Sequence, residues 1–373
     1  MTYTHIIGHR SMIFDEHRNS LYANAINKVV NPESIVLDLG AGLGIHGLMA
    51  IKAGARKVYL VEPDAELDVA ARIAGQIKSS DRIQCLQGTI EESQIPELVD
   101  VIISVFTGNF LFQEDLLPSL FFARDKYLKP GGIMIPDCAR MEVVPVIAED
   151  FFNKHIAGWS SPSQGIDFGL VREYAANNVY YDDHRGMTGG FLAEPAEIIH
   201  LDFIRVEKAD CRNTIEVKIT KDGLCHGWLG WFQTRLGDAW LSTSPLEPKT
   251  HWSQAFLPLD PPMPMKAGDL VYFQLHRPEF GEWTWIVKNG NNSQKHSTFL
   301  SQPISSAVMQ KKSGGHKASL NTKGQAALHV LQKLNGKEST ADIALEIAES
   351  WPQLFPDQEH ARRFVISLIG RFT

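Results

Sequence analysis

The stretch IVLDLGAGLG, residues 35–44, constrains the fold of this chain more than any other. Its apolar beginning is typical of a fully buried strand, and Gly40, Gly42 and Gly44 then allow a tight turn into a helix. A second apolar strand pattern, KVYLVE, follows at residues 57–62 after one helix-length segment. Because strands that alternate with helices pair in parallel, the sequence predicts a Rossmann-like α/β domain.

The pattern changes along the chain and divides it into parts. Residues 1–30 have helical apolar spacing, and residues 31–140 carry the alternation of strands and helices. Short alternating runs such as IIHLDFIRV and DLVYFQLH fill residues 141–302 and predict an antiparallel β-barrel. A polar linker at 303–318 then precedes amphipathic helical patterns at 319–373, which predict a small helical C-terminal domain.

The composition narrows the classes of partner and the compartment. The formal net charge of −7 argues against nucleic acid as a partner. The four cysteines are scattered without a CxxC pair, so neither a zinc site nor a disulfide framework is predicted. The charged N-terminal sequence does not resemble a signal peptide, and no apolar run is long enough to cross a bilayer. We therefore expect a cytoplasmic protein that binds no metal, nucleic acid or membrane.

Two acidic residues beside the glycine turn indicate what the turn binds. Asp38 lies within the first strand, and Glu62 ends the second, where a carboxylate can accept hydrogen bonds from both hydroxyls of a ribose. A nicotinamide-dependent dehydrogenase also uses an acid there, and it is the alternative. Its GxGxxG spacing fails from Gly40, because Ile45 occupies the last position. The pattern therefore favours the nucleoside-containing cofactor of a methyltransferase.

Five segments resemble, in order, the motifs of one family, the protein arginine methyltransferases. They are YTHIIGHRSMIFDEHRNSLY, VLDLGAGLGIHGLMAIKAGARKVYLVE, GTIEE, ARDKYLKPGGIMIP and KTHWSQAFLPL, and the resemblance covers roughly residues 3–300. It implies a class I methyltransferase that uses S-adenosyl-L-methionine and covers this cofactor with N-terminal helices. It also implies a homodimer, in which an arm near residues 165–186 of the barrel domain docks on the Rossmann-like part of a partner.

The resemblance also assigns the cofactor site. Arg18 would hold the carboxylate of the cofactor through a charge-assisted hydrogen bond, with a solvated surface arginine as the alternative. Glu62 would accept from the ribose hydroxyls. Glu91 would face the adenine, unless it and its neighbour Glu92 are simply exposed. The positions that would line the methionine and ribose are Asp38, Gly40 and Gly42.

In the family, two glutamates of a hairpin loop clamp the arginine of the substrate. Two carboxylates can orient a charged guanidinium so that one nitrogen attacks the methyl group in line. The segment SVFTGNFLFQED, residues 104–115, matches this loop. Glu114 matches the second glutamate, but Val105 replaces the first, and Thr107 and Asn109 stand where the family has larger or aromatic side chains. We therefore expect an altered substrate pocket beside an unaltered cofactor site.

A proton acceptor is also implied by the resemblance. Asp15 and His251 match a pair that lies near the acceptor in the family, and a carboxylate that holds an imidazole makes a sound general base. His251 alone could be a structural histidine, but it belongs to a Thr-His-Trp signature, and Trp252 of that signature is expected in the substrate pocket. The predicted catalytic residues are thus Glu114, His251 and Asp15.

Val105 leaves three functions open. We favour N-methylation of a peptide or natural-product side chain, at an imidazole, amine or guanidino nitrogen, with one glutamate and a histidine–aspartate base. The second is a true arginine methyltransferase, peptidyl or free, in which another group replaces the missing glutamate. The third is a catalytically inactive scaffold that binds the cofactor.

The C-terminal helices carry a looser resemblance of their own. LNTKGQAALHVLQKLNGKESTADIALEIAESW and HARRFVISLIGRF resemble the small winged-helix domains that bind leader peptides in pyrroloquinoline quinone biosynthesis. This implies peptide binding by the C-terminal domain, and a helical bundle used only for packing is the alternative.

Overall fold

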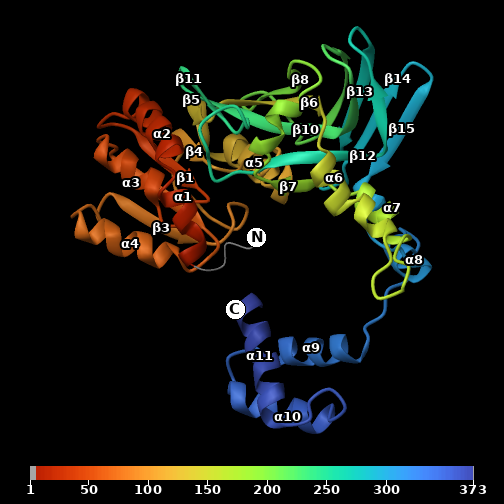
Figure 1. The fold of residues 1–373 in the computed structure, drawn as a ribbon. Coiled ribbons are helices and arrows are strands. Elements are labelled where there is room, and N and C mark those ends of the chain that lie inside the picture. The colour runs from red at the N-terminus through yellow and green to blue at the C-terminus, as the bar shows by residue number, and fades with distance from the viewer. Residues whose placement is uncertain (1–5, 373) are drawn as a thin grey trace. The chain divides into compact units, whose positions relative to one another are not determined.

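A computed structural model describes residues 6–372, so the first five residues of the predicted N-terminal helices lie outside the described part. The chain separates into two compact units, of which the first ends at Pro303 and the second begins at Ile304 (Figure 1). The first unit starts with η1 (Ile6–His9), α1 (Arg10–Ile13) and α2 (Glu16–Val29).

The predicted Rossmann-like domain is confirmed, because a parallel sheet follows α2, in the strand order β3-β2-β1-β4-β5. The order reverses at β1, which pairs with β2 on one side and β4 on the other, so the carboxyl ends of these strands border a crevice suited to a ligand. Its strands are β1 (Ile35–Leu39), β2 (Lys57–Glu62), β3 (Ile83–Gln87), β4 (Val99–Ser104) and β5 (Leu128–Ile135). Its helices are α3 (Ile45–Lys52), α4 (Leu67–Gln76) and α5 (Leu117–Tyr127).

Two antiparallel sheets follow, as the alternating runs predict. One has the order β7-β12-β10-β6-β8 with β11 paired to β10, and the other has the order β15-β14-β13-β9. Trp228 of β10 stacks on Phe273 of β13 at 4.2 Å between ring centroids, which packs the two sheets together. The strands are β6 (Cys138–Val146), β7 (Tyr180–Asp182), β8 (Ala196–Asp202), β9 (Cys211–Lys218), β10 (Gly223–Leu236), β11 (Ala239–Ser242), β12 (Gln254–Met265), β13 (Leu270–Arg277), β14 (Thr284–Asn289) and β15 (Asn292–Ser297).

The stretch between β6 and β8 contains the predicted arm. It forms α6 (Glu149–His155), η3 (Ala157–Ser160), α7 (Val171–Ala176), the short strand β7 and η4 (Arg185–Gly190). Several of its large apolar side chains face solvent, and Leu170 is 89% exposed. This exposure is unusual for leucine and marks the arm as a candidate surface for association.

The second unit contains the helices α8 (Ser306–Lys312), α9 (Thr322–Lys333), α10 (Thr340–Ser350) and α11 (Gln358–Phe372). Of these, α9, α10 and α11 pack around a small core of their own. Helix α8 lies inside the predicted linker, where the side chain of Ser305 caps it by accepting from the backbone N–H of Val308. Between Ile304 and Phe372 the structure describes no strand, so these residues form a helical bundle without the strands of a wing. Within residues 6–372, no helix combines the length and the apolar character needed to cross a bilayer.

Candidate active site

A cavity of about 610 Å³ lies at the carboxyl ends of β1, β2 and β4. Its wall comes from the glycine turn after β1, the end of β2, the loop after β4, the N-terminal helices, and the segment at His251 and Trp252. The glycine motif, the predicted clamp loop, and His251 and Trp252 of the Thr-His-Trp signature thus surround one space.

The glycine turn adopts a backbone conformation that residues with a side chain rarely adopt. Gly40 and Gly42 have φ of 71° and 51°, and both line the cavity. A Cβ atom at Gly40 would collide with the ring of Phe106. The carboxylate of Glu62 accepts from the backbone N–H of Gly42 at 2.8 Å, which ties the turn to the end of β2. Burial raises the pKa of Glu62, although hydrogen bonds from the backbone oppose this.

Arg18 is 1% exposed and lines the cavity, so it is not a solvated surface charge. Its Nη2 donates to the carbonyl oxygen of Met12 at 2.7 Å, and its Nε donates to Oδ1 of Asn19 at 3.0 Å. These two bonds fix the side chain while it borders the cavity. A buried guanidinium that borders a cavity can bind a carboxylate there through charge-assisted hydrogen bonds.

Two residues expected in the cofactor site lie outside the cavity lining. Asp38 is 1% exposed beneath the glycine turn, and its Oδ2 accepts from the backbone N–H of Gly47 at 2.7 Å. Burial raises the pKa of Asp38 to about 7, against the hydrogen bond from Gly47. This carboxyl therefore anchors the first turn of α3. Glu91 is exposed and accepts from the hydroxyl of Ser119 at 2.6 Å.

His46 was not among the predicted site residues, yet it lines the cavity and is 4% exposed. Its ring lies 4.4 Å from that of Tyr22, and Nε2 has no hydrogen-bond partner within the described structure. Burial lowers its pKa well below the usual value, and the charges of Arg18 and His251 act in the same direction. No local signal marks it, because only the packing of α2 on α3 buries the ring.

Asp15 and His251 lie together although 236 residues separate them in sequence. Oδ2 of Asp15 lies 3.1 Å from Nδ1 of His251 and 3.0 Å from its backbone nitrogen, while Oδ1 accepts from the backbone N–H of Arg18 and caps α2. Burial would raise the pKa of Asp15, but these hydrogen bonds outweigh it, and the pKa is lowered. Burial lowers the pKa of His251, against the bond to Asp15. A neutral imidazole that donates from Nδ1 keeps Nε2 free to accept a proton.

The loop after β4 is strained. Four of its non-glycine residues have left-handed backbone, and φ reaches 78° at Glu114. Glu114 lines the cavity, where partial desolvation raises its pKa. Val105 lines the same cavity and packs against the main core, so an aliphatic side chain occupies the position of the first expected carboxylate.

Thr107 and Asn109 connect this loop to the antiparallel β-sheet domain. Nε1 of Trp252 donates to the carbonyl oxygen of Thr107 at 2.7 Å. Oδ1 of Asn109 accepts from the backbone N–H of Ser253, and its Nδ2 donates to Oε1 of Gln113, both at 2.7 Å. All of these except Ser253 line the cavity. The expected pocket residues therefore lie at the cavity and also hold the loop against the segment that carries His251.

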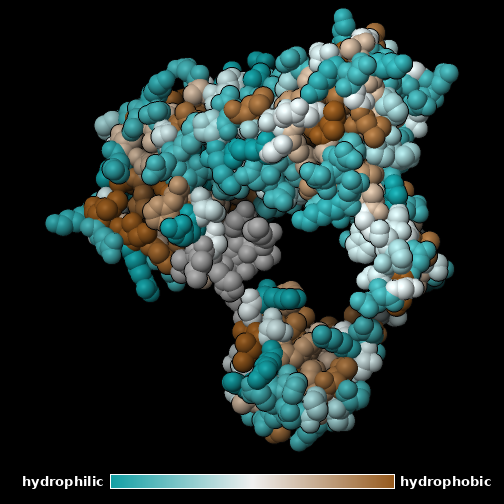
Figure 2. All heavy atoms as spheres, in the orientation of Figure 1, coloured by the Kyte–Doolittle hydropathy of each residue, from teal (hydrophilic) through white to brown (hydrophobic). Residues whose placement is uncertain are grey.

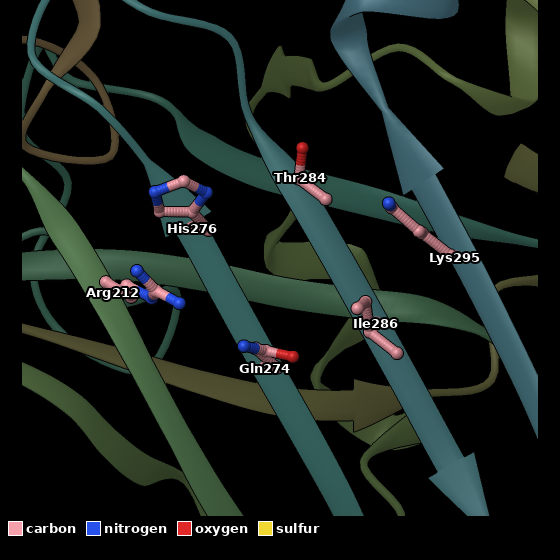
Figure 3. A pocket seen from close by; sticks show the side chains of 6 residues that line it. All are labelled: Arg212, Gln274, His276, Thr284, Ile286 and Lys295. Atoms are coloured by element: carbon pink, nitrogen blue, oxygen red, sulfur yellow. The ribbon is translucent and has the colours of Figure 1, made fainter.

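A second hollow, of about 200 Å³, lies on the outer face of the four-stranded sheet (Figure 3). Figure 3 shows Gln274 and His276 of β13 and Ile286 of β14 on this face, between the cations Arg212 and Lys295 of the outer strands. None of the residues in this hollow belongs to the loop after β4 or to the glycine turn. The cavity at the parallel sheet is therefore the candidate active site.

The glycine turn, the buried arginine and the imidazole–carboxylate pair define an S-adenosyl-L-methionine-dependent methyltransferase. Residues 137–280 match the family model described as the arginine methyltransferase oligomerization subdomain. The chain is 31% identical over 279 residues to protein arginine N-methyltransferase 1 of Schizosaccharomyces pombe, covering 72% of this chain and 81% of that protein. It is 33% identical over 275 residues to protein arginine N-methyltransferase 6 of Danio rerio, covering 69% and 78%. The chain belongs to the protein arginine N-methyltransferase family.

A solved structure supports the same assignment and the cofactor. A chain of the Trypanosoma brucei PRMT1 enzyme-prozyme heterotetrameric complex with AdoHcy matches with a TM-score of 0.73 and 28% identity, over 80% of this chain and 99% of that one. The residues present here fit the cofactor, because a buried guanidinium, a carboxylate at the end of β2 and a glycine turn all face one cavity. S-adenosyl-L-methionine supplies the electrophilic methyl group.

We expect Glu62→Ala to weaken the binding of S-adenosylhomocysteine by about 1–3 kcal/mol, through the loss of charged hydrogen bonds to the ribose. Isothermal titration calorimetry measures this directly. Glu62→Gln should lose less, because its amide oxygen can still accept from Gly42. Glu33→Ala, an exposed residue before β1, is the control and should bind like the wild type. Equal affinities for wild type and Glu62→Ala would contradict the assignment of Glu62.

Proposed function

We propose that the protein N-methylates a side chain of a peptide or natural product, using one carboxylate where relatives of this type are expected to use two. Val105 carries the proposal, because its aliphatic side chain lines the cavity at the position of the first expected glutamate. A guanidinium that met this wall would be desolvated with only Glu114 to balance its charge, which is unfavourable. A neutral imidazole brings no such charge into the cavity and therefore requires no compensation.

His251 and Asp15 would remove the proton from this acceptor. The acceptor nitrogen forms a bond to the methyl carbon while the bond from that carbon to sulfur breaks, and the nitrogen then loses a proton to Nε2 of His251. The lowered pKa keeps His251 neutral and therefore able to accept at neutral pH. Asp15 fixes the orientation of the ring and stabilises the imidazolium that forms.

Retained arginine methylation is the second candidate, and the identities of 31% and 33% to proteins named arginine N-methyltransferases favour it. In this case another group would replace the missing carboxylate. The side-chain carbonyl oxygens of Asn109 and Gln113 lie at the cavity, and each has a lone pair beyond its present hydrogen bond. A catalytically inactive protein that binds the cofactor is the third.

Methyl transfer from labelled cofactor to matched probe peptides separates the three candidates. The probes carry arginine, histidine or lysine in the same flanking sequence, and mass spectrometry reads the products. Faster labelling of the histidine or lysine probe supports the altered acceptor, whereas preference for arginine supports the second candidate. Binding of S-adenosylhomocysteine in calorimetry without labelling of any probe points to the inactive protein.

We further propose that the helices after Ile304 bind the peptide that carries the acceptor. The support is their resemblance to leader-peptide-binding domains and their separate core, built around residues such as Val330, Ile343 and Val365. A chain shortened to end at Pro303 should then methylate free small acceptors as well as the full chain, but lose affinity for the peptide. An unchanged KM for the peptide would contradict this role.

Association through the arm is also proposed. The matched oligomerization subdomain includes the arm at 165–186, where Leu170 is 89% exposed and Ile166 is 58% exposed. Figure 2 shows apolar side chains on the Rossmann-like part near α4, where Ile77 is 44% exposed. Such a surface could receive the arm of a second copy.

Light scattering at micromolar concentration is expected to give twice the mass of one chain for the wild type. Leu170→Asp should shift the mass toward the monomer, because a charge would be buried in the contact. Leu270→Asp is the matched control, since Leu270 is 50% exposed at the start of β13, outside the arm. A monomeric wild type would exclude the dimer.

A further inference from the structure

Arg277 is a buried cation at the end of β13 that faces away from the solvent. Figure 3 shows Gln274 and His276 on the outer face of the sheet, and strand alternation turns Arg277 to the opposite side. Its side chain is 7% exposed and lies over the rings of Phe112 and Trp283, at 6.0 and 5.5 Å from their centroids. Nη1 has no hydrogen-bond partner within the described structure.

The guanidinium reaches the loop after β4. Nη2 of Arg277 lies 2.8 Å from Oδ1 of Asp115, and the same oxygen accepts from the backbone N–H of Phe280 at 3.2 Å. Asp115 thereby adds polar contacts between the loop and the β13–β14 connection to the ring contacts of Phe110 and Phe112 with Trp283. The side chain of Arg277 is 7% exposed and that of Asp115 is 30% exposed, so loss of Asp115 would leave the buried charge of Arg277 incompletely compensated.

The contact between Arg277 and Asp115 is important because Asp115 directly follows Glu114. Glu114 and Asp115 are consecutive, and both have left-handed backbone, with φ of 78° and 53°. Left-handed backbone is unfavourable for residues other than glycine and persists only where surrounding contacts enforce it. The side chain of Glu114 has no hydrogen bond to a described residue that would hold it in place, so its direction depends on the backbone that Asp115 fixes.

We propose that Arg277 is a positioning residue, which holds the carboxylate of Glu114 at the cavity by binding Asp115. This inference rests on the proposed role of Glu114 as the acceptor clamp. Arg277 itself does not line the cavity, so it acts through the loop. Displacement of a clamp by about 1 Å is enough to lower turnover by about 10²-fold.

Arg277→Met and Asp115→Asn test the proposal together with the matched control Arg212→Met. Arg212 lies on β9, directly paired to the neighbour of Arg277, but its side chain is on the outer face. Hydrogen exchange should show faster exchange of amides 110–115 in both loop-directed variants, with the Arg212→Met rates unchanged. Arg277→Lys keeps the charge without the fork and should restore part of the protection. Equal exchange in wild type and Arg277→Met would overturn the proposal.

Turnover then distinguishes positioning from general destabilisation. With the best of the three probe peptides, Arg277→Met should lower kcat by about 10-fold to 10²-fold, while calorimetry shows unchanged affinity for S-adenosylhomocysteine. In a Glu114→Gln background the same substitution should change kcat by less than about twofold, because the carboxylate to be positioned is gone. A full additional loss in that background overturns the role of Arg277. Undiminished turnover of Glu114→Gln alone refutes the role of Glu114 instead.

Discussion

His251→Ala is expected to lower kcat by on the order of 10²-fold or more and to leave the affinity for S-adenosylhomocysteine nearly unchanged. The reason is that only the imidazole is lost. The backbone N–H of residue 251 still donates to Asp15, and Asp15 still caps α2, so Arg18 keeps its position. His276→Ala, on the outer face of the same domain, is the control and should retain full turnover.

The pH dependence gives this prediction a second measurement. Burial lowers the pKa of His251, so the ring loses its proton below the usual value of about 6.5. The rate should therefore stay level from pH 8 down to about 6.5, and fall only as His251 becomes protonated at lower pH. The folded protein favours the neutral ring, so His251 contributes to the free energy of unfolding above pH about 6.5. This contribution is lost as the pH falls through the lowered pKa of the folded state. An acid limb that survives in His251→Ala would assign it to another group.

Val105→Glu is expected to lower turnover on a histidine acceptor by about tenfold or more. A second carboxylate in the cavity with Glu114 would raise the pKa of one of them or force them apart, and each unit of pKa corresponds to about 1.4 kcal/mol. A neutral acceptor brings no charge to relieve this repulsion. An arginine peptide does, so its affinity should rise in the variant.

The control for this substitution is Val105→Gln, because glutamine is nearly the same size as glutamate and carries no charge. If the loss comes from repulsion, the glutamine variant should retain more turnover than the glutamate variant at neutral pH. The assay uses the arginine, histidine and lysine probes with wild type and both variants. Arginine turnover by the wild type at least equal to that of the other probes would mean that Val105 does not mark a changed acceptor.

Local sequence patterns predict the parts of the site whose shape depends on backbone conformation. The turn at Gly40 and Gly42 could be predicted, because a buried strand followed by closely spaced glycines has few other conformations. The proximity of Asp15 and His251 came only from the family resemblance, since no local pattern reports a contact across 236 residues. For the same reason, Arg277 was not predicted as a site residue. Its partner Asp115 belongs to a part of the sequence that was assigned to a different domain.

Other differences have a local cause that the patterns conceal. Asp38 was expected at the cofactor, but the helix that follows the glycine turn needs an acceptor for the amide of Gly47, and the buried carboxyl serves this need. Residues 303–318 were expected to form a linker because they are polar. Ser305 nevertheless caps a short helix there, and a single cap is a weak signal in a sequence of this composition.

The two carboxylate oxygens of Asp15 have different partners, which links the N-terminus of α2 to His251. One oxygen begins α2, the helix that presents Arg18 to the cavity, and the other orients His251. If the start of α2 unwinds, the anchor for the cofactor and the proton acceptor are lost in the same step. If Arg18 and His251 have the proposed roles, this one carboxylate couples deprotonation of the acceptor to binding of the cofactor.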